Sequence, residues 1–197
     1  MTAIGKVRRR LARARFRRWF GVHFALAVAL FFVGILAGYG VSDPEIIQEM
    51  TPYGAGGTLP VEFTAGTIFL NNLLAVGVDA LGLVTLGLAS AFSLLLNGFV
   101  LGLVMGLAST EVSPLLALAL VVPHGVLELP AFWLIAAVAF RVTHRLARYL
   151  WGRDERVLTR QELFEVGVLF VATVVLIGVA AWIEVNVTPV VGDLVAG

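Results

Sequence analysis

Basic residues occupy only two segments of this chain. All 14 lysine and arginine residues lie within positions 6–18 and 141–160, so residues 19–140 contain none. The chain as a whole is 59% hydrophobic and 14% charged, whereas a soluble domain carries about 25% charged residues. These features indicate an integral membrane protein, and its 197 residues suffice for one membrane domain.

Five apolar segments follow one another along the chain. They lie at residues 19–41, 114–141 and 162–183, with two more inside 63–108. A helix needs about 20 apolar residues to cross a hydrocarbon core of about 30 Å. We divide the segment 63–108 at a tight hairpin near Asp79-Ala80-Leu81-Gly82. The sequence therefore predicts an all-α, polytopic helical membrane protein with about five transmembrane helices.

The two basic segments also predict the topology. An amino terminus in the cytoplasm leaves all the lysines and arginines inside, in agreement with the positive-inside rule. We therefore expect a multi-pass protein of the cell membrane whose carboxy terminus lies outside. Its predicted parts are a basic cytoplasmic segment (1–18), a helical membrane domain (19–185) with an outer loop (42–62) and a basic cytoplasmic connector (141–161), and an outer tail (186–197).

Two of these parts allow more than one interpretation. In the basic segment, Ile4, Val7, Leu11 and Ala14 recur at helical spacing, which is typical of an amphipathic helix on an anionic leaflet; a disordered flank that only fixes the topology is the alternative. In the outer loop, Ser42-Asp43-Pro44 predicts the start of a short helix. That loop either docks an external partner or is an ordinary connector.

The stretch Val122-Pro123-His124-Gly125-Val126-Leu127-Glu128-Leu129-Pro130 places ionisable groups inside an apolar segment. We expect the fourth helix to be interrupted at Pro123-His124-Gly125, because proline lacks a backbone donor and broken backbone is tolerated at this depth only inside protein or along a wet cavity. His124 and Glu128 are four positions apart and share a face of a helix. Three interpretations stay open: a structural hydrogen-bonded pair, half a site for a cation or proton, and catalysis.

Further polar residues are expected near this pair. Asn71, Asn72 and Asn97 lie in apolar segments, where their amides either bond neighbouring helices together or line a permeation path. A metal site needs more ligands than His124 and Glu128, and the predicted depth of Asp79 argues against its contribution. We therefore predict neither a metal nor a cofactor.

Glycines predict close helix packing. Gly98, Gly102 and Gly106 form one flat stripe at four-residue spacing, and Gly34 and Gly38 form a small-residue pair. The stripe could meet a helix of the same chain or of another copy, and we favour a homodimer.

Several function classes lack the residues they need. There is no cysteine, which excludes disulfides, thiolate metal sites and cysteine nucleophiles. The sequence contains no Ser-His-Asp set, phosphate-binding loop or metallopeptidase motif, and its basic residues border apolar segments without stacking aromatics. We predict a protein that is not an enzyme, has no catalytic residues and binds no nucleic acid.

Three blocks resemble the signature motifs of the stage II sporulation protein M family. They are Phe69-Leu70-Asn71-Asn72, Leu96-Asn97-Gly98-Phe99-Val100-Leu101-Gly102, and Pro123-His124-Gly125-Val126-Leu127-Glu128-Leu129-Pro130-Ala131. The resemblance covers residues 63–140 and implies a multi-pass membrane domain without catalytic activity. The sporulation member is a membrane anchor that assembles with cell-wall-degrading partners during engulfment. The matching positions are Asn71, Asn72, Asn97, Gly98, Gly102, Pro123, His124, Gly125, Glu128 and Pro130.

Two hypotheses of function follow. The first is a non-enzymatic membrane scaffold or assembly component, which sits in the lipid bilayer and contacts other membrane or extracytoplasmic proteins. The alternative is a transporter or channel for an ion or small polar solute, built around His124 and Glu128. A water-filled path to the pair favours transport, and a dry, fully bonded pair favours the scaffold.

Overall fold

The computed structural model describes residues 3–42, 64–111 and 113–196, and every regular element in these ranges is a helix. The predicted outer loop, apart from Ser42, and its short helix lie outside the described residues. The helices are α1 (Ala3–Ala12), the 3-10 helix η1 (Phe16–Trp19), α2 (Val22–Gly40), α4 (Ala65–Leu81), α5 (Leu88–Glu111), α6 (Pro114–Leu150), α7 (Arg160–Asn186) and α8 (Thr188–Ala196).

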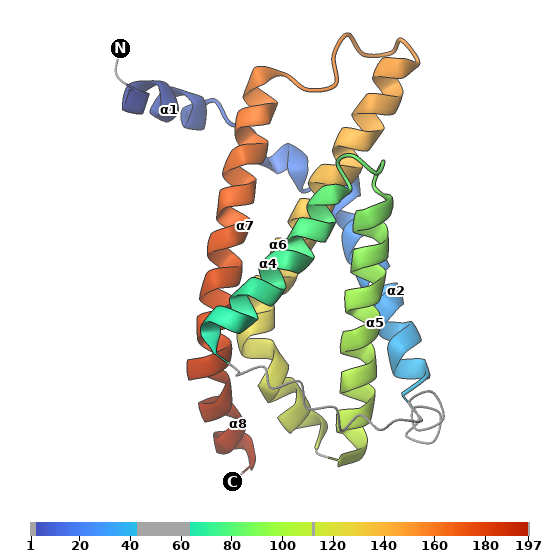
Figure 1. Ribbon diagram of the computed structural model, residues 1–197, viewed down its shortest axis with the longest axis vertical. Helices are drawn as coiled ribbons and strands as arrows, with labels where there is room; N and C mark the ends of the chain where they lie inside the picture. Colours follow the sequence, from blue (N-terminus) through green and yellow to red (C-terminus); the bar gives the residue numbers. More distant parts are fainter. Residues whose placement is uncertain (1–2, 43–63, 112, 197) are drawn as a thin grey trace.

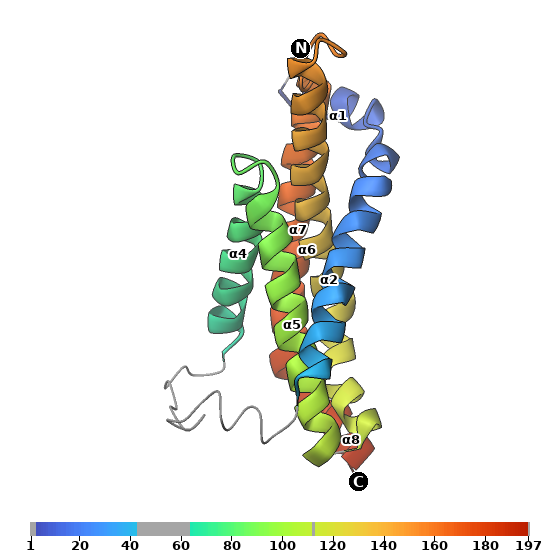
Figure 2. The ribbon, with the colours of Figure 1, turned by 90° about the vertical axis from the view of Figure 1, so that its right-hand side faces the viewer.

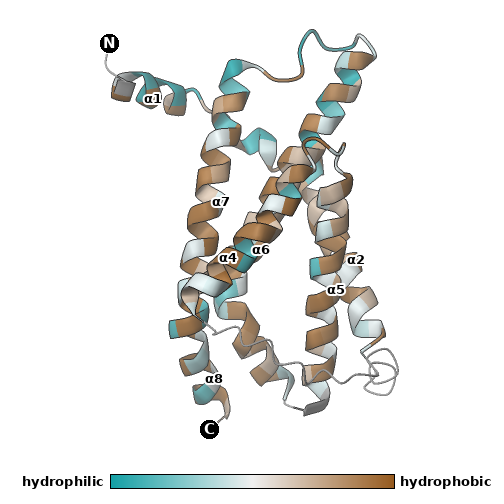
Figure 3. Cartoon of the chain, viewed as in Figure 1, coloured by the Kyte–Doolittle hydropathy of each residue, from teal (hydrophilic) through white to brown (hydrophobic). Residues whose placement is uncertain are grey.

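The long helices form an elongated bundle with one basic end (Figures 1 and 2). The basic end holds α1, η1, the last turns of α6 and the start of α7, while α8 lies at the opposite end (Figure 1). Hydrophilic residues are concentrated on α1 and around the α6–α7 connection, and the helices between the two ends are mainly hydrophobic (Figure 3). The fold therefore brings the two basic segments of the sequence to the same end.

Within the described residues, four helices are long and apolar enough to cross a bilayer: α2, α5, α6 and α7. Helix α4 is also apolar but has 17 residues, which corresponds to about 26 Å, less than the hydrocarbon core of about 30 Å. Large apolar side chains such as Leu36 and Val171 point out of the bundle and are more than 60% exposed. This surface is suited to lipid, and the chain is a polytopic helical membrane protein.

The predicted interruption of the fourth helix is a bend and not a break. Helix α6 continues through Pro123 and Pro130 to Leu150, and its axis changes direction between its yellow and orange parts (Figure 1). A proline removes one backbone hydrogen bond and displaces the preceding turn, which a helix can accommodate by bending. The helix also extends past position 141, so Arg141, Arg145 and Arg148 are helical.

The hairpin between α4 and α5 begins at the last residue of the predicted stretch, Gly82, and extends to Gly87. Helix α4 ends at Leu81 and α5 begins at Leu88. The turn uses left-handed backbone at Leu86 (φ 54°) and Gly87 (φ 81°), and glycine adopts this conformation without steric cost. The Ser90 hydroxyl donates a hydrogen bond of 2.6 Å to the carbonyl oxygen of Asp79, which fastens the end of α4 to the start of α5.

Helices α2 and α5 touch through their backbones. A β-carbon added at Gly98 would lie 3.0 Å from the carbonyl carbon of Phe31. A β-carbon added at Gly102 would lie 2.8 Å from the carbonyl carbon of Ile35. A β-carbon at Gly38 would lie 2.8 Å from the carbonyl carbon of Phe99, and one at Gly34 would lie 2.9 Å from the backbone nitrogen of Phe99. A β-carbon at Gly106 would instead meet the side chain of Ser42, which follows α2. Gly98 and Gly102 of the stripe therefore pack within the chain, against the backbone of α2 at Phe31 and Ile35.

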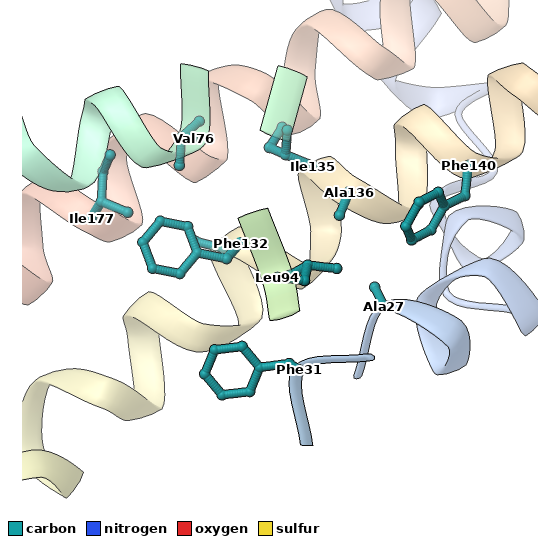
Figure 4. Packing of buried hydrophobic residues seen from close by; sticks show 10 residues of the cluster. Ala27, Phe31, Val76, Leu94, Phe132, Ile135, Ala136, Phe140 and Ile177 are labelled. Atoms are coloured by element: carbon teal, nitrogen blue, oxygen red, sulfur yellow. The ribbon is translucent and has the colours of Figure 1, made fainter. Parts of the chain in front are cut away.

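The apolar core lies where α2, α4, α5, α6 and α7 converge. Phe31, Leu94 and Phe132 come from three different helices and meet there (Figure 4). Val76 of α4 and Ile177 of α7 complete the same cluster. The core holds the middle of α6 in place, directly after the segment that carries His124 and Glu128.

Helix α1 projects sideways from the basic end (Figure 1). Its apolar residues Ile4, Val7 and Leu11 are exposed. Its last turn contacts the bundle, where Gln161 donates a hydrogen bond of 2.9 Å to the Arg10 carbonyl. Of the two interpretations of this segment, the structure agrees with the helical one.

Candidate functional site

Three side chains from two helices meet near the end of the bundle opposite the basic end. His124 and Glu128 belong to α6, and Glu184 belongs to the last turn of α7. Each offers one ligand atom, and these three atoms lie within 4.8 Å of one another. We call these three residues the polar site.

A cavity adjoins the polar site on the side of α4. Its volume is about 270 Å³, and its wall includes all three residues of the polar site together with Thr67, Ile68, Asn71 and Asn72. Helix α4 starts after Thr64 with a capping box, in which the Thr67 N–H donates a hydrogen bond of 3.2 Å to the Thr64 hydroxyl. Asn71 and Asn72 follow about two turns later. That cap fixes where α4 starts and so which of its residues reach the cavity.

A second, smaller cavity lies on the other side of the pair. Its volume is about 100 Å³, and Asn97, His124 and Glu128 contribute to its wall among apolar residues such as Phe31 and Phe132. The Asn97 amide donates hydrogen bonds to the Ser93 carbonyl (2.8 Å) and hydroxyl (3.3 Å) one turn earlier in α5. The two cavities share His124 and Glu128 and together include all five polar residues singled out in the sequence.

Both members of the predicted pair have polar neighbours from other helices. The Nδ1 atom of His124 lies 3.3 Å from the hydroxyl of Thr188, the first residue of α8. The side chain of Asn72 faces the Glu128 carboxylate. Helix α7 ends at Asn186 and α8 starts two residues later, and this change of direction brings Thr188 to His124.

Sequence analysis did not identify three residues of this region: Glu184, Thr67 and Thr188. Glu184 directly follows the predicted end of the last spanning segment, a position where a carboxylate is expected to lie at the membrane surface. The signal that was present is a lone carboxylate one position beyond a long apolar run, near no basic residue. Thr67 and Thr188 carry no signal, since threonine at a helix start is expected for capping alone.

Asp79 is not part of this arrangement. Its side chain is 1% exposed and lies near Ser90 and Ser93 in the α4–α5 hairpin, about two turns along α4 from Asn72. This placement agrees with the expectation that Asp79 does not complete a site with His124. The second carboxylate beside His124, after that of Glu128, belongs to Glu184.

A second polar cluster fastens the basic end. Arg18 contacts Glu165 and Glu162 of α7, with N–O distances of 2.7 and 3.2 Å. The Trp19 indole N–H donates to Glu165 at 2.9 Å. The hydrogen bond to Glu165 raises the pKa of the Arg18 guanidinium, so this cation is permanently charged. All the groups of this cluster have partners, which is the pattern of a structural contact.

The polar site has the chemistry of a binding site. It combines an imidazole nitrogen and two carboxylates at the wall of a cavity, and a water molecule occupies about 30 Å³ of liquid volume. The larger cavity of about 270 Å³ therefore has room for an ion with several waters or for a small polar solute. His124, Glu128 and Glu184 lie within helices that are long and apolar enough to cross a bilayer, and ionisable groups in such helices are costly to bury and typically mark solute pathways.

Comparison with known proteins agrees with the motifs. The family model described as stage II sporulation protein M matches residues 27–189. An archaeal relative, the uncharacterized protein MJ0793 of Methanocaldococcus jannaschii, is 30% identical over 166 residues, which cover 83% of this chain and 92% of the relative. No solved structure gives a significant match. The match includes every residue of the polar site and both cavities, and this chain belongs to the stage II sporulation protein M family.

Proposed function

We propose that this protein is a non-enzymatic, multi-pass protein of the cell membrane that binds a cation or small polar solute at the polar site and passes it across the bilayer. One observation carries the proposal: six amide, imidazole and carboxylate side chains from four helices line two adjoining cavities that share His124 and Glu128. They are Asn71, Asn72, Asn97, His124, Glu128 and Glu184.

The cavities argue against a purely structural role for the pair. A structural pair would be dry and enclosed by its hydrogen-bond partners, because an unsatisfied polar group in an apolar environment costs about 1–3 kcal/mol. Here the pair lies between two cavities, of about 270 and 100 Å³. With the amino terminus in the cytoplasm, as the positive-inside rule predicts, the polar site lies toward the outer surface and loads from outside.

Two substitutions of Glu128 test the proposal. Glu128→Gln keeps the size and the hydrogen-bonding capacity of the side chain but removes the charge, so we expect the purified protein to keep its melting temperature and to lose cation flux in liposomes. Glu128→Leu also removes the acceptors and is expected to lower stability, because Asn72 loses its partner. Glu155→Gln, at a 93% exposed side chain in the connector, is the matched control. Unchanged flux in Glu128→Gln would contradict the proposal.

A non-enzymatic scaffold is the second candidate. The observation that favours it is the backbone contact between α2 and α5, which includes Gly38 and Gly102. Helices at this distance cannot slide past each other without collision. Helices α2 and α5 are therefore suited to hold a fixed surface for other membrane or extracytoplasmic proteins. The test is isolation of the native complex in mild detergent: a defined partner at constant stoichiometry, retained in Glu128→Gln, supports the scaffold.

A homodimer remains part of the proposal, although the stripe that suggested it packs inside the chain. Glycines with open space beside them, Gly77 on α4 and Gly167 on α7, offer other faces for a second copy. The molecular mass of the purified protein in detergent, measured by light scattering, tests this expectation: a mass of one chain would contradict it.

A further inference from the structure

We propose that His124, Glu128 and Glu184 form a binding site for a divalent transition-metal cation of the zinc class. This inference names the substrate of the function proposed above and rests on it for its physiological role. The binding site itself rests on the arrangement of the three side chains.

The spacing of the ligand atoms fits a metal ion. Zinc lies about 2.0–2.2 Å from nitrogen and oxygen ligands, which places the ligands of a tetrahedral site about 3.4 Å apart. The three candidate atoms lie within 4.8 Å of one another. Metal binding requires the two glutamate side chains to close the remaining distance by rotation about their terminal bonds, and these torsions have broad energy wells.

The charges of the site also favour a divalent cation. Two carboxylates repel each other in a medium of low dielectric constant. All lysines and arginines belong to segments 6–18 and 141–160, which lie at the opposite end of the bundle (Figure 1), so none of them neutralises these carboxylates. A divalent cation balances both charges and forms bonds to all three groups. A monovalent cation would leave one negative charge uncompensated within the membrane.

The histidine selects among divalent cations. Imidazole nitrogen is a good ligand for Zn²⁺, Fe²⁺ and Co²⁺, whereas Mg²⁺ and Ca²⁺ prefer sites made of oxygen atoms alone. The Thr188 hydroxyl lies 3.3 Å from Nδ1 of His124 and can accept a hydrogen bond from the Nδ1–H group. With the proton on Nδ1, the lone pair of Nε2 is left free for a metal, which is the usual arrangement of a metal-binding histidine and its supporting acceptor.

Three protein ligands leave a coordination position open. Structural zinc sites have four protein ligands, whereas a site with three retains water or a substrate in the fourth position. The adjoining cavity of about 270 Å³ provides the space for that water. An incomplete ligand set also lets the ion leave again, as passage across the membrane requires.

Cobalt binding to the full-length protein tests the site directly. Co²⁺ occupies zinc sites and gains strong visible absorption in a site of tetrahedral geometry. After treatment with a chelator, the detergent-purified protein is expected to bind one Co²⁺ per chain, and Zn²⁺ but not Mg²⁺ is expected to displace it. Glu184→Gln should weaken binding at least tenfold, and Thr188→Val about tenfold through the orientation of His124.

The controls separate loss of ligands from loss of fold. Glu155→Gln should bind Co²⁺ like the unmodified chain, and the melting temperature of each variant shows whether it is folded. If Glu184→Gln does not fold, Glu184→Asp keeps the charge with a shorter reach and should still weaken binding measurably. No Co²⁺ binding by the unmodified chain, or equal affinity in folded Glu184 variants and in Glu155→Gln, would overturn the inference.

Flux measurements distinguish this inference from the proposed function. Flux of Na⁺ or K⁺ that depends on Glu128, in a protein that does not bind Co²⁺, would overturn the metal site and leave the transport function standing. Co²⁺ bound through Glu184, without flux of any cation, would support the metal site and overturn transport.

Discussion

The guanidinium of Arg18 binds both carboxylate oxygens of Glu165, with N–O distances of 2.9 and 2.7 Å, although the two residues are 147 positions apart. The Trp19 indole and the Arg15 backbone N–H donate to the same carboxylate at 2.9 and 3.0 Å. The Glu165 side chain has no exposed surface. This contact pins the segment before the first spanning helix onto the start of the last one.

Loss of the guanidinium should therefore destabilise the whole protein. Arg18→Ala leaves the buried Glu165 carboxylate without its counter-ion, and removal of one partner of a buried pair typically costs about 3–5 kcal/mol. Since Arg18 itself is partly exposed, we expect a value near the lower limit. Thermal unfolding in detergent measures the effect, with Arg17→Ala as control because Arg17 is exposed. Equal melting temperatures of the two variants would show that the pair contributes nothing.

Gly102→Leu should separate α2 from α5. The first added carbon alone would lie 2.8 Å from the carbonyl carbon of Ile35, and backbone cannot yield as a flexible side chain can. Overpacking of a tight contact costs about 1–3 kcal/mol or more, so we expect a lower melting temperature or aggregation during purification. Gly77→Leu is the matched control, since there is open space next to Gly77. A Gly102→Leu protein as stable as this control would contradict the backbone contact.

Cysteine labelling tests the orientation in the membrane. The chain has no cysteine of its own, so a single cysteine at Gly56 or at Glu155 is the only site for a thiol reagent. With basic segments in the cytoplasm, an impermeant reagent added to intact cells should modify the variant at position 56 and not the one at position 155. After the cells are broken, both should react. Labelling of position 155 in intact cells would reverse the proposed topology.

The α6–α7 connection should loosen at low pH. The hydrogen bonds donated by Arg148, both 3.0 Å long, lower the pKa of the Asp154 carboxyl, and Arg145 lies 3.2 Å away. A carboxyl whose pKa is lowered by folding stabilises the fold above its unfolded value of about 3.9 and loses that contribution as the pH falls through the folded value. Amide hydrogen exchange in residues 151–159 should therefore accelerate, relative to its intrinsic rate, as the pH falls below about 4. In Asp154→Asn, the amides of residues 151–159 should exchange fast already at neutral pH. Equal exchange rates in this variant and in the unmodified chain at neutral pH would show that the ion pairs do not stabilise the connection.

Much of the polar site could be predicted because its residues are polar or ionisable, whereas the other residues of the spanning segments are mainly apolar. His124, Glu128, Asn72 and Asn97 are conspicuous in apolar segments, and the cost of exposing them to lipid predicts a place inside the bundle. Asn71 is exposed and reaches the polar site only at the wall of the larger cavity. The same reasoning located the hairpin near Asp79 and the close packing of Gly102. In each case a local property of the residue determines its surroundings.

The remaining features depend on relationships that a single sequence does not contain. Glu184 becomes part of the site only because α7 passes beside α6, and the sequence gives no register between these helices. The continuous course of α6 through Pro123 depends on neighbours that tolerate a bend. The partner of the glycine stripe was likewise undecided, since a flat helical face fits a helix of the same chain as well as one from a second copy.

The contact between α2 and α5 also has a consequence for synthesis and insertion. Gly38 of α2 and Gly102 of α5 are 64 positions apart, which corresponds to about 3–13 seconds at 5–20 residues per second. During that interval α2 resides in the bilayer without its partner, while α4 is being made. A glycine-lined face carries no polar side chain, so the delay leaves nothing exposed that lipid must solvate. His124 and Glu128 of α6 are made later, when α4 and α5, which supply Asn72 and Asn97 to the two cavities, have already been synthesised.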